Sequence, residues 1–158
     1  TMANAPPPKS STTHINAPGF KAHGRVDLWM DNDVLHYEAT GPFNAEVFDQ
    51  LAVAQGNFLK SLTFSGPWAS ICTMRVSAMA TPEAIERYTA LMRKPKPEGF
   101  EPVATAFVIA PEIEGCKIMA PHFERVYQLI ERPFRIVSTM EQAQQWVHTK
   151  IAASRTGG

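Results

Sequence analysis

The segment of residues 67–83 constrains the fold more than any other part of the sequence. Residues 68–73 are apolar or small at both alternating sets of positions, which is typical of a strand covered on both faces. Thr81 then provides an N-cap hydroxyl, Pro82 suits the first position of a helix, and Glu83 places an acid in the first turn. The segment therefore predicts a buried strand, a connecting loop and a helix, in a sheet that has helices on both sides.

Strand and helix patterns alternate along the rest of the chain. An antiparallel hairpin is predicted over residues 25–40, where two alternating segments flank the turn-forming run Asp31-Asn32-Asp33. The later elements are helices over residues 44–62, 82–93, about 120–131 and 139–152, and strands over residues 103–110 and 134–138. Because Pro121 suits a first turn but kinks a helix interior, the third helix is expected either to begin near Ala120 or to bend there after a short earlier turn. This order predicts an α/β fold, a single layered domain with about four helices. Its mixed five-stranded sheet would have an N-terminal antiparallel hairpin and mainly parallel remaining strands.

Length and composition fit one domain, because 158 residues with 44% hydrophobic side chains can bury a full core. Residues 1–19 are rich in Pro, Ser, Thr, Ala and Asn, so this N-terminal tail is expected to be unstructured when alone. Residues 20–153 are expected to form the domain, and residues 154–158 a flexible C-terminal tail.

Charge and cysteine content exclude several classes of partner. Fifteen basic and fifteen acidic residues balance, so we expect no nucleic-acid partner, which normally requires a basic surface. No apolar run approaches the ~20 residues of a membrane span, and no signal peptide is recognisable at the N-terminus, so a cytoplasmic protein that is not transmembrane is expected. Cys72 and Cys116 form no CxxC pair and are expected to be free thiols.

Three places in the chain carry a resemblance to a known family. They are residues 41–46 (GPFNAE), residues 80–83 (ATPE), and residues 134–137 (FRIV) together with residues 141–147 (EQAQQWV). From about Gly24 to Ala152 the chain resembles the STAS superfamily, the anti-sigma-factor-antagonist-like domains, particularly the bacterial group similar in shape to CRAL-TRIO lipid-transfer domains. The resemblance implies a regulatory domain that binds a protein partner, or a carrier of a lipid or other apolar ligand.

The resemblance also directs attention to the loop before the second helix. Typical members carry a phosphorylatable Ser or Thr there, in an Asp-Ser-Ser-Gly-like turn. The matching residues 74–81 read MRVSAMAT, with no acid, no serine pair and no glycine. Ser77 and Thr81 are the remaining hydroxyls, and Arg75 adds a positive charge near a helix N-terminus. We therefore take Arg75, Ser77 and Thr81 as candidate contacts for an anionic ligand group or an acidic partner side chain, although Thr81 can also be a plain N-cap and Arg75 an ordinary surface cation.

The function predicted from these features is a non-enzymatic regulatory or interaction domain. It would bind an unknown protein partner, or a small apolar or anionic ligand, at the loop between the third strand and the second helix, and a homodimer is left open. No catalytic residue, cofactor or metal is predicted, because the five histidines lack ligand spacing and Cys72 is expected to be buried and inert.

Two alternatives to this function are a carrier of a lipid or other apolar ligand and a small enzyme of unknown reaction. A closed cavity lined by Met74, Met79, Phe107 or Ile118 would favour the carrier. Polar side chains converging in a cleft would favour the enzyme, and a flat apolar patch would favour partner binding.

Overall fold

The computed structural model describes residues 9–15 and 22–156. Its sheet has six strands, and their order in space follows their order in the chain. The strands are β1 (Lys9–Ser11), β2 (Arg25–Asp31), β3 (Val34–Thr40), β4 (Ala69–Arg75), β5 (Thr105–Val108) and β6 (Phe134–Val137). The helices are the 3-10 turn η1 (Thr12–His14) and α1 (Ala45–Lys60), α2 (Pro82–Arg93), α3 (Cys116–Leu129) and α4 (Met140–Thr156).

The sheet is antiparallel at its start and parallel thereafter. β1 pairs with β2, and β2 with β3, in antiparallel orientation. The pairs β3–β4, β4–β5 and β5–β6 are parallel. The predicted α/β domain, with its mixed sheet, N-terminal antiparallel hairpin and four α-helices, is therefore confirmed. None of the helices in the described part of the chain is both long and apolar enough to cross a membrane.

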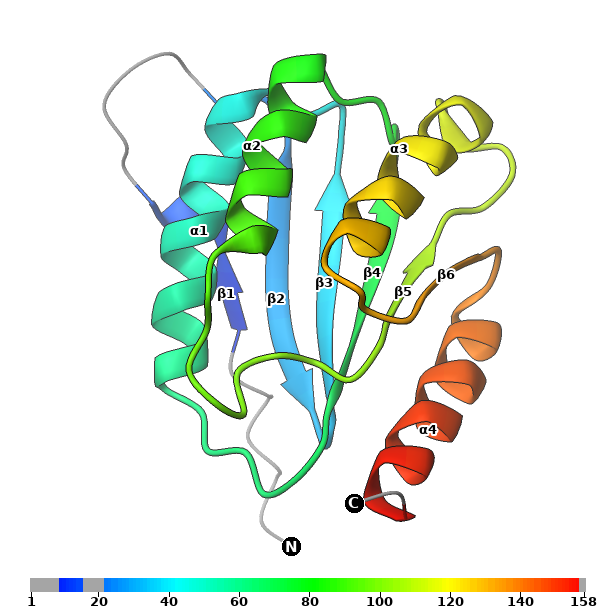
Figure 1. Ribbon diagram of the computed structural model, residues 1–158. Coiled ribbons are helices and arrows are strands. Elements are labelled where there is room, and N and C mark those ends of the chain that lie inside the picture. Colours follow the sequence, from blue (N-terminus) through cyan, green and yellow to red (C-terminus); the bar gives the residue numbers. More distant parts are fainter. Residues whose placement is uncertain (1–8, 16–21, 157–158) are drawn as a thin grey trace, which may run out of the picture.

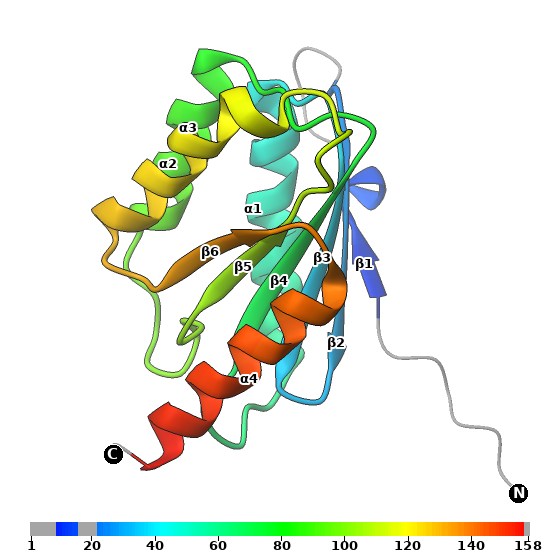
Figure 2. The same ribbon diagram turned by 90° about the vertical axis from the view of Figure 1, so that its right-hand side faces the viewer.

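The strand order determines where the helices lie. Crossovers between parallel strands are right-handed, and here every crossover moves one strand further in the same direction. All three crossover helices, α1, α2 and α3, therefore cover the same face of the sheet (Figure 1). Helix α4 follows the last strand and packs on the opposite face, against β4, β5 and β6 (Figure 2).

Alternate residues of the central strands supply the two cores. On β4, Cys72 and Met74 face α1–α3, whereas Ala69 and Ile71 face α4. The α4 face is a compact cluster of small aliphatic side chains: Val34, Ala69, Ile71, Ala106, Val108, Ala143, Val147 and Ile151. The other face is larger and contains most of the aromatic residues.

The prediction of five strands was wrong, since the sheet has a sixth, β1. β1 lies in the tail of residues 1–19, whose composition indicates no regular structure. Its residues pair with the free edge of β2, and the Thr12 hydroxyl accepts a hydrogen bond from the Val26 amide at 3.0 Å. The tertiary partner therefore supplies the bonds that the local sequence cannot. Residues 1–8 and 16–19 of the tail lie outside the described residues, as do residues 20 and 21.

The end of the last helix also differs from prediction. Helix α4 continues to Thr156 rather than ending near residue 152, and Arg155 in its last turn donates to Asp33 at 3.2 Å. That contact ties the helix to the β2–β3 turn. Helix α3 begins at Cys116 with Pro121 inside it, so of the two expected arrangements the one with helical structure before the proline is observed. Of the predicted C-terminal tail, residues 157 and 158 lie outside the described residues.

Candidate functional site

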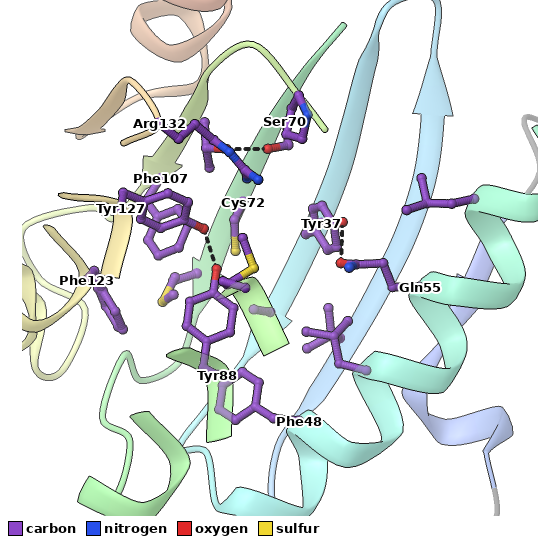
Figure 3. Close-up of a pocket in the computed structure, with 18 of the residues that line it drawn as sticks. Tyr37, Phe48, Gln55, Ser70, Cys72, Tyr88, Phe107, Phe123, Tyr127 and Arg132 are labelled. Carbon is purple, nitrogen blue, oxygen red and sulfur yellow. Dashed lines mark hydrogen bonds between the residues drawn. The ribbon is translucent and has the colours of Figure 1, made fainter. Parts of the chain in front are cut away.

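A cavity of about 70 Å³ lies between the sheet and the helices α1, α2 and α3. Figure 3 shows the side chains that surround it. Its wall is mostly apolar and aromatic, and draws chiefly on Tyr37, Phe43, Phe48, Leu51, Cys72, Met74, Tyr88, Met92, Phe107, Phe123 and Tyr127. A volume of this size has room for several water molecules. The cavity is therefore a defined internal site rather than a packing defect of one methyl group.

Most polar groups in the wall are paired with one another. The Tyr37 hydroxyl donates to Gln55 Oε1 at 2.6 Å, and the hydroxyls of Tyr88 and Tyr127 hydrogen-bond to each other. Ser70 and Thr105, on the neighbouring strands β4 and β5, share a hydrogen bond of 2.7 Å between their hydroxyls. These pairs satisfy the polar groups inside the wall without exposing charge to the cavity.

Burial keeps the tyrosines and the cysteine of the wall neutral. It raises the pKa of Tyr37, Tyr88 and Tyr127 above the usual value, and raises the pKa of the Cys72 thiol to about 12. Near neutral pH none of these groups is an anion. The cavity therefore offers no thiolate or phenolate nucleophile.

Arg132 brings a positive charge to one end of this apolar wall. Its side chain is only 7% exposed, lies over the Tyr127 ring at 5.7 Å, and donates through Nη1 to Thr105 Oγ1 at 3.2 Å. Its Nη2 is buried and has no hydrogen-bond partner among the described residues. The nearest acid is Glu101, 61% exposed, with Oε1 at 3.9 Å from Nη2. Leaving a buried charged donor unpaired costs about 1–3 kcal/mol or more, so this atom requires an explanation.

The loop of residues 94–104, between α2 and β5, covers the same end of the cavity. It contributes Lys96, Phe100 and Pro102 to the wall. The Trp68 indole Nε1 donates to the Gly99 carbonyl at 2.8 Å and fastens the loop to the segment that enters β4. Burial lowers the pKa of Lys96, the positive charge of Arg132 lowers it further, and Glu101 partly offsets both effects.

The structure does not bring Arg75, Ser77 and Thr81 together around one opening. Arg75 ends β4, is exposed, and has Nε 3.9 Å from Glu38 Oε1. It is on the same alternate set of β4 residues as Ile71, which faces α4 rather than α2. Thr81 uses its hydroxyl to cap α2, accepting from the Ala84 amide at 3.0 Å.

Ser77 is buried beneath the surface of the predicted loop. Its hydroxyl donates to Glu114 Oε1 at 2.6 Å and accepts from the Met79 amide at 3.1 Å. The Ala78 amide donates to the Glu114 carbonyl at 2.8 Å, which ties this loop to the one before α3. Ser77 therefore fastens two loops together, and its hydroxyl already has two partners.

Two of the four residues proposed for a carrier cavity do line it. Met74 and Phe107 are part of the wall. Met79 packs against the same core but is not in the wall, and Ile118 is 64% exposed on α3. Arg132 and Lys96 were missed, because Arg132-Pro133 marks a helix stop and the Lys-Pro run 94–97 marks a surface loop. Neither pattern shows which way the basic side chain points.

Comparisons with known proteins add little about the site. No protein-family model matches the chain, and no curated protein matches it. Among solved structures, the crystal structure of apo-SiaC from Pseudomonas aeruginosa is similar, with a TM-score of 0.45 and 17% sequence identity over 77% of this chain and 96% of that chain. A similarity at this level carries no argument about function, and the resemblance to the STAS superfamily stays a prediction.

Proposed function

We propose that this protein is a non-enzymatic binding protein, a carrier or sensor that holds a small, largely apolar molecule between its sheet and helices α1–α3. The observation that carries the proposal is the cavity itself. Its volume of about 70 Å³ among packed side chains corresponds to a cost of about 2 kcal/mol of folding free energy. The opposite face of the same strands is filled by close-fitting aliphatic side chains, so this cost is confined to one face.

The chemistry of the wall supports binding rather than catalysis. None of the described residues in the wall is Asp, Glu or His, the side chains that most often act as general base. The Cys72 thiol, with its pKa of about 12, is protonated at neutral pH. An apolar pocket with few polar groups is the usual form of a small-molecule binding site.

Native mass spectrometry of the purified protein, followed by calorimetric titration with butan-1-ol, tests the proposal. Butan-1-ol is neutral, its short chain suits a cavity of about 70 Å³, and it reports binding to the apolar wall alone. The variant Cys72→Leu enlarges a wall residue and should weaken butan-1-ol binding at least ~10-fold, whereas Ile71→Val, on the α4 face of the same strand, should leave it unchanged. Equal and negligible binding by the wild type and Cys72→Leu, with no retained mass, would reject the proposed function.

A second candidate is contact with a second copy of the chain through the loop that carries Arg75, Ser77 and Thr81. Val76 in this loop is 67% exposed and has a φ of 66°, a left-handed conformation that is strained for a β-branched residue. Sedimentation velocity of wild type and Val76→Asp over a range of concentrations tests this candidate. A dimer that Val76→Asp abolishes would support it, and monomers throughout would reject it.

A further inference from the structure

The end of the cavity near Arg132 carries more positive charge than the protein neutralises there. The guanidinium has five N–H donors in a fixed fork, and the structure uses Nη1 on Thr105 while Nη2 has no hydrogen-bond partner among the described residues. Lys96 lies in the same wall, close enough for the charge of Arg132 to act on it. Glu101 is the acid that faces both cations, and it is mostly exposed. One positive charge therefore remains uncompensated.

The position of Arg132 is fixed by the fold, so its charge is held at the cavity. Glu131 adopts a left-handed conformation with a φ of 56°, and the Arg132 amide donates to the Tyr127 carbonyl at 3.1 Å. This turn at the end of α3 directs the side chain back over the Tyr127 ring. Figure 3 shows the guanidinium beside Ser70, directed toward the space enclosed by the helices.

We infer, building on the proposed function, that the molecule bound in the cavity is an amphipathic monocarboxylate. Its carboxylate accepts a hydrogen bond from Nη2 of Arg132 and pairs with Lys96, and its hydrocarbon part lies against the aromatic wall near Phe107 and Tyr88. Arginine and carboxylate have matching planar geometry, which makes this pairing strong in a buried site. A single negative charge balances the single uncompensated positive charge. A phosphate monoester, with a charge of about −1.5 to −2 at pH 7, would exceed it.

A matched pair of ligands tests the inference. Butanoate and butan-1-ol have the same chain length and differ in the charged group. Calorimetric titration of the wild-type protein with each should show butanoate binding at least ~10-fold more tightly. In Arg132→Met the affinity for butanoate should fall ~10-fold to ~100-fold, while the affinity for butan-1-ol should stay the same or rise.

Three further variants separate the role of the buried fork from general loss of charge. Lys96→Met should weaken butanoate binding less than Arg132→Met, since Lys96 is only half-buried. Arg132→Lys keeps the charge but not the fork, and should give an intermediate affinity. Arg135→Met removes an exposed cation that lies over Trp146 at 5.3 Å, outside the cavity wall, and should change neither affinity. Thermal unfolding of each variant checks that it is folded.

The outcomes distinguish this inference from the proposed function. If butan-1-ol binds and butanoate binds no more tightly, the inference is wrong and the apolar binding site stands. If Arg132→Met is folded and binds butanoate as well as the wild type does, Arg132 is not the carboxylate partner and the inference is again wrong. If neither ligand binds the wild type and no mass is retained, the proposed function fails as well.

Discussion

The two faces of the sheet share their strands but differ in what they contain. The face beneath α4 is a compact group of alanine, valine and isoleucine side chains. The face beneath α1–α3 contains the tyrosine pairs, the buried arginine and a cavity of about 70 Å³. Because strand residues alternate between faces, a single sequence such as that of β4 serves both purposes. Tight packing on one face supplies stability that lets the other face retain a cavity.

The substitution with the largest expected effect tests whether the side chains around the cavity are well packed. Phe107 is buried, and its ring lies 4.9 Å from the Phe134 ring, 5.3 Å from the Phe123 ring and 5.6 Å from the Tyr127 ring. Phe107→Ala should therefore lower the free energy of unfolding by ~3–5 kcal/mol. Urea unfolding monitored by circular dichroism measures it. A loss below about 1.5 kcal/mol would mean that the whole face is loosely packed.

Adding volume should separate the two faces. Ala106→Leu places three extra carbons into the compact α4 face and should destabilise the protein by ~1–3 kcal/mol through overpacking. At Cys72 the change to leucine adds two heavy atoms, and these enter the cavity, so Cys72→Leu should change stability by less than about 1 kcal/mol. Urea unfolding of both variants under one set of conditions makes the comparison. Similar losses would show that the cavity cannot accept the added volume.

The two helix caps provide a smaller, symmetrical test. Thr81 caps α2 on the cavity face, and Thr139 begins α4 with the reciprocal bonds of a capping box to Gln142, at 3.2 and 3.3 Å. Thr81→Ala and Thr139→Ala should each cost ~1 kcal/mol in thermal unfolding, with the Ser variants as controls that retain the hydroxyl. A loss with Thr81→Ala several times larger than with Thr139→Ala would indicate that Thr81 does more than cap its helix.

The smallest expected effect depends on pH and concerns His36. The imidazole stacks on the Trp29 ring at 5.3 Å, and burial lowers its pKa below the usual 6.5, with Asp31 partly offsetting the shift. As pH falls through 6.5, the unfolded chain therefore takes up the proton before the folded protein does. Stability should be complete above pH 6.5 and fall as the pH drops toward the lowered value. His36→Phe, measured by urea unfolding from pH 7.5 to 5, should remove this part of the pH dependence, and an unchanged profile would contradict the assignment.

Local patterns were sufficient to predict most of the fold. The apolar run of β4, the Thr81-Pro82 start of α2 and the capping box at Thr139 each depend on residues close together in the sequence. β1 could not be predicted, because its backbone pairs with the edge of β2, which is distant in the sequence. The composition of the tail contains no sign of that pairing.

The cavity could be predicted only in part. Met74 and Phe107 lie on apolar strands, so their inward direction follows from alternation. The direction of Arg132 depends on the left-handed turn at Glu131 and on the hydroxyl of Thr105, which is distant in the sequence. Hydroxyl pairs such as Tyr88 with Tyr127 likewise require the helices to be docked. Contacts between side chains that are far apart in the sequence depend on the tertiary structure, so they cannot be predicted from a single sequence.

The sheet adds its strands in the order in which a ribosome delivers them. Each new strand can pair with the one made just before it, and each crossover helix can dock on the same face as the previous one. Arg132 emerges before β6, so the cavity face can close while α4 is still being synthesised. Until α4 docks, Ile71, Ala106 and Val108 are uncovered on the other side, and such apolar surface favours aggregation of a nascent chain. Helix α4 is therefore the last of these helices to dock on the sheet, and its docking buries the apolar surface that favours aggregation.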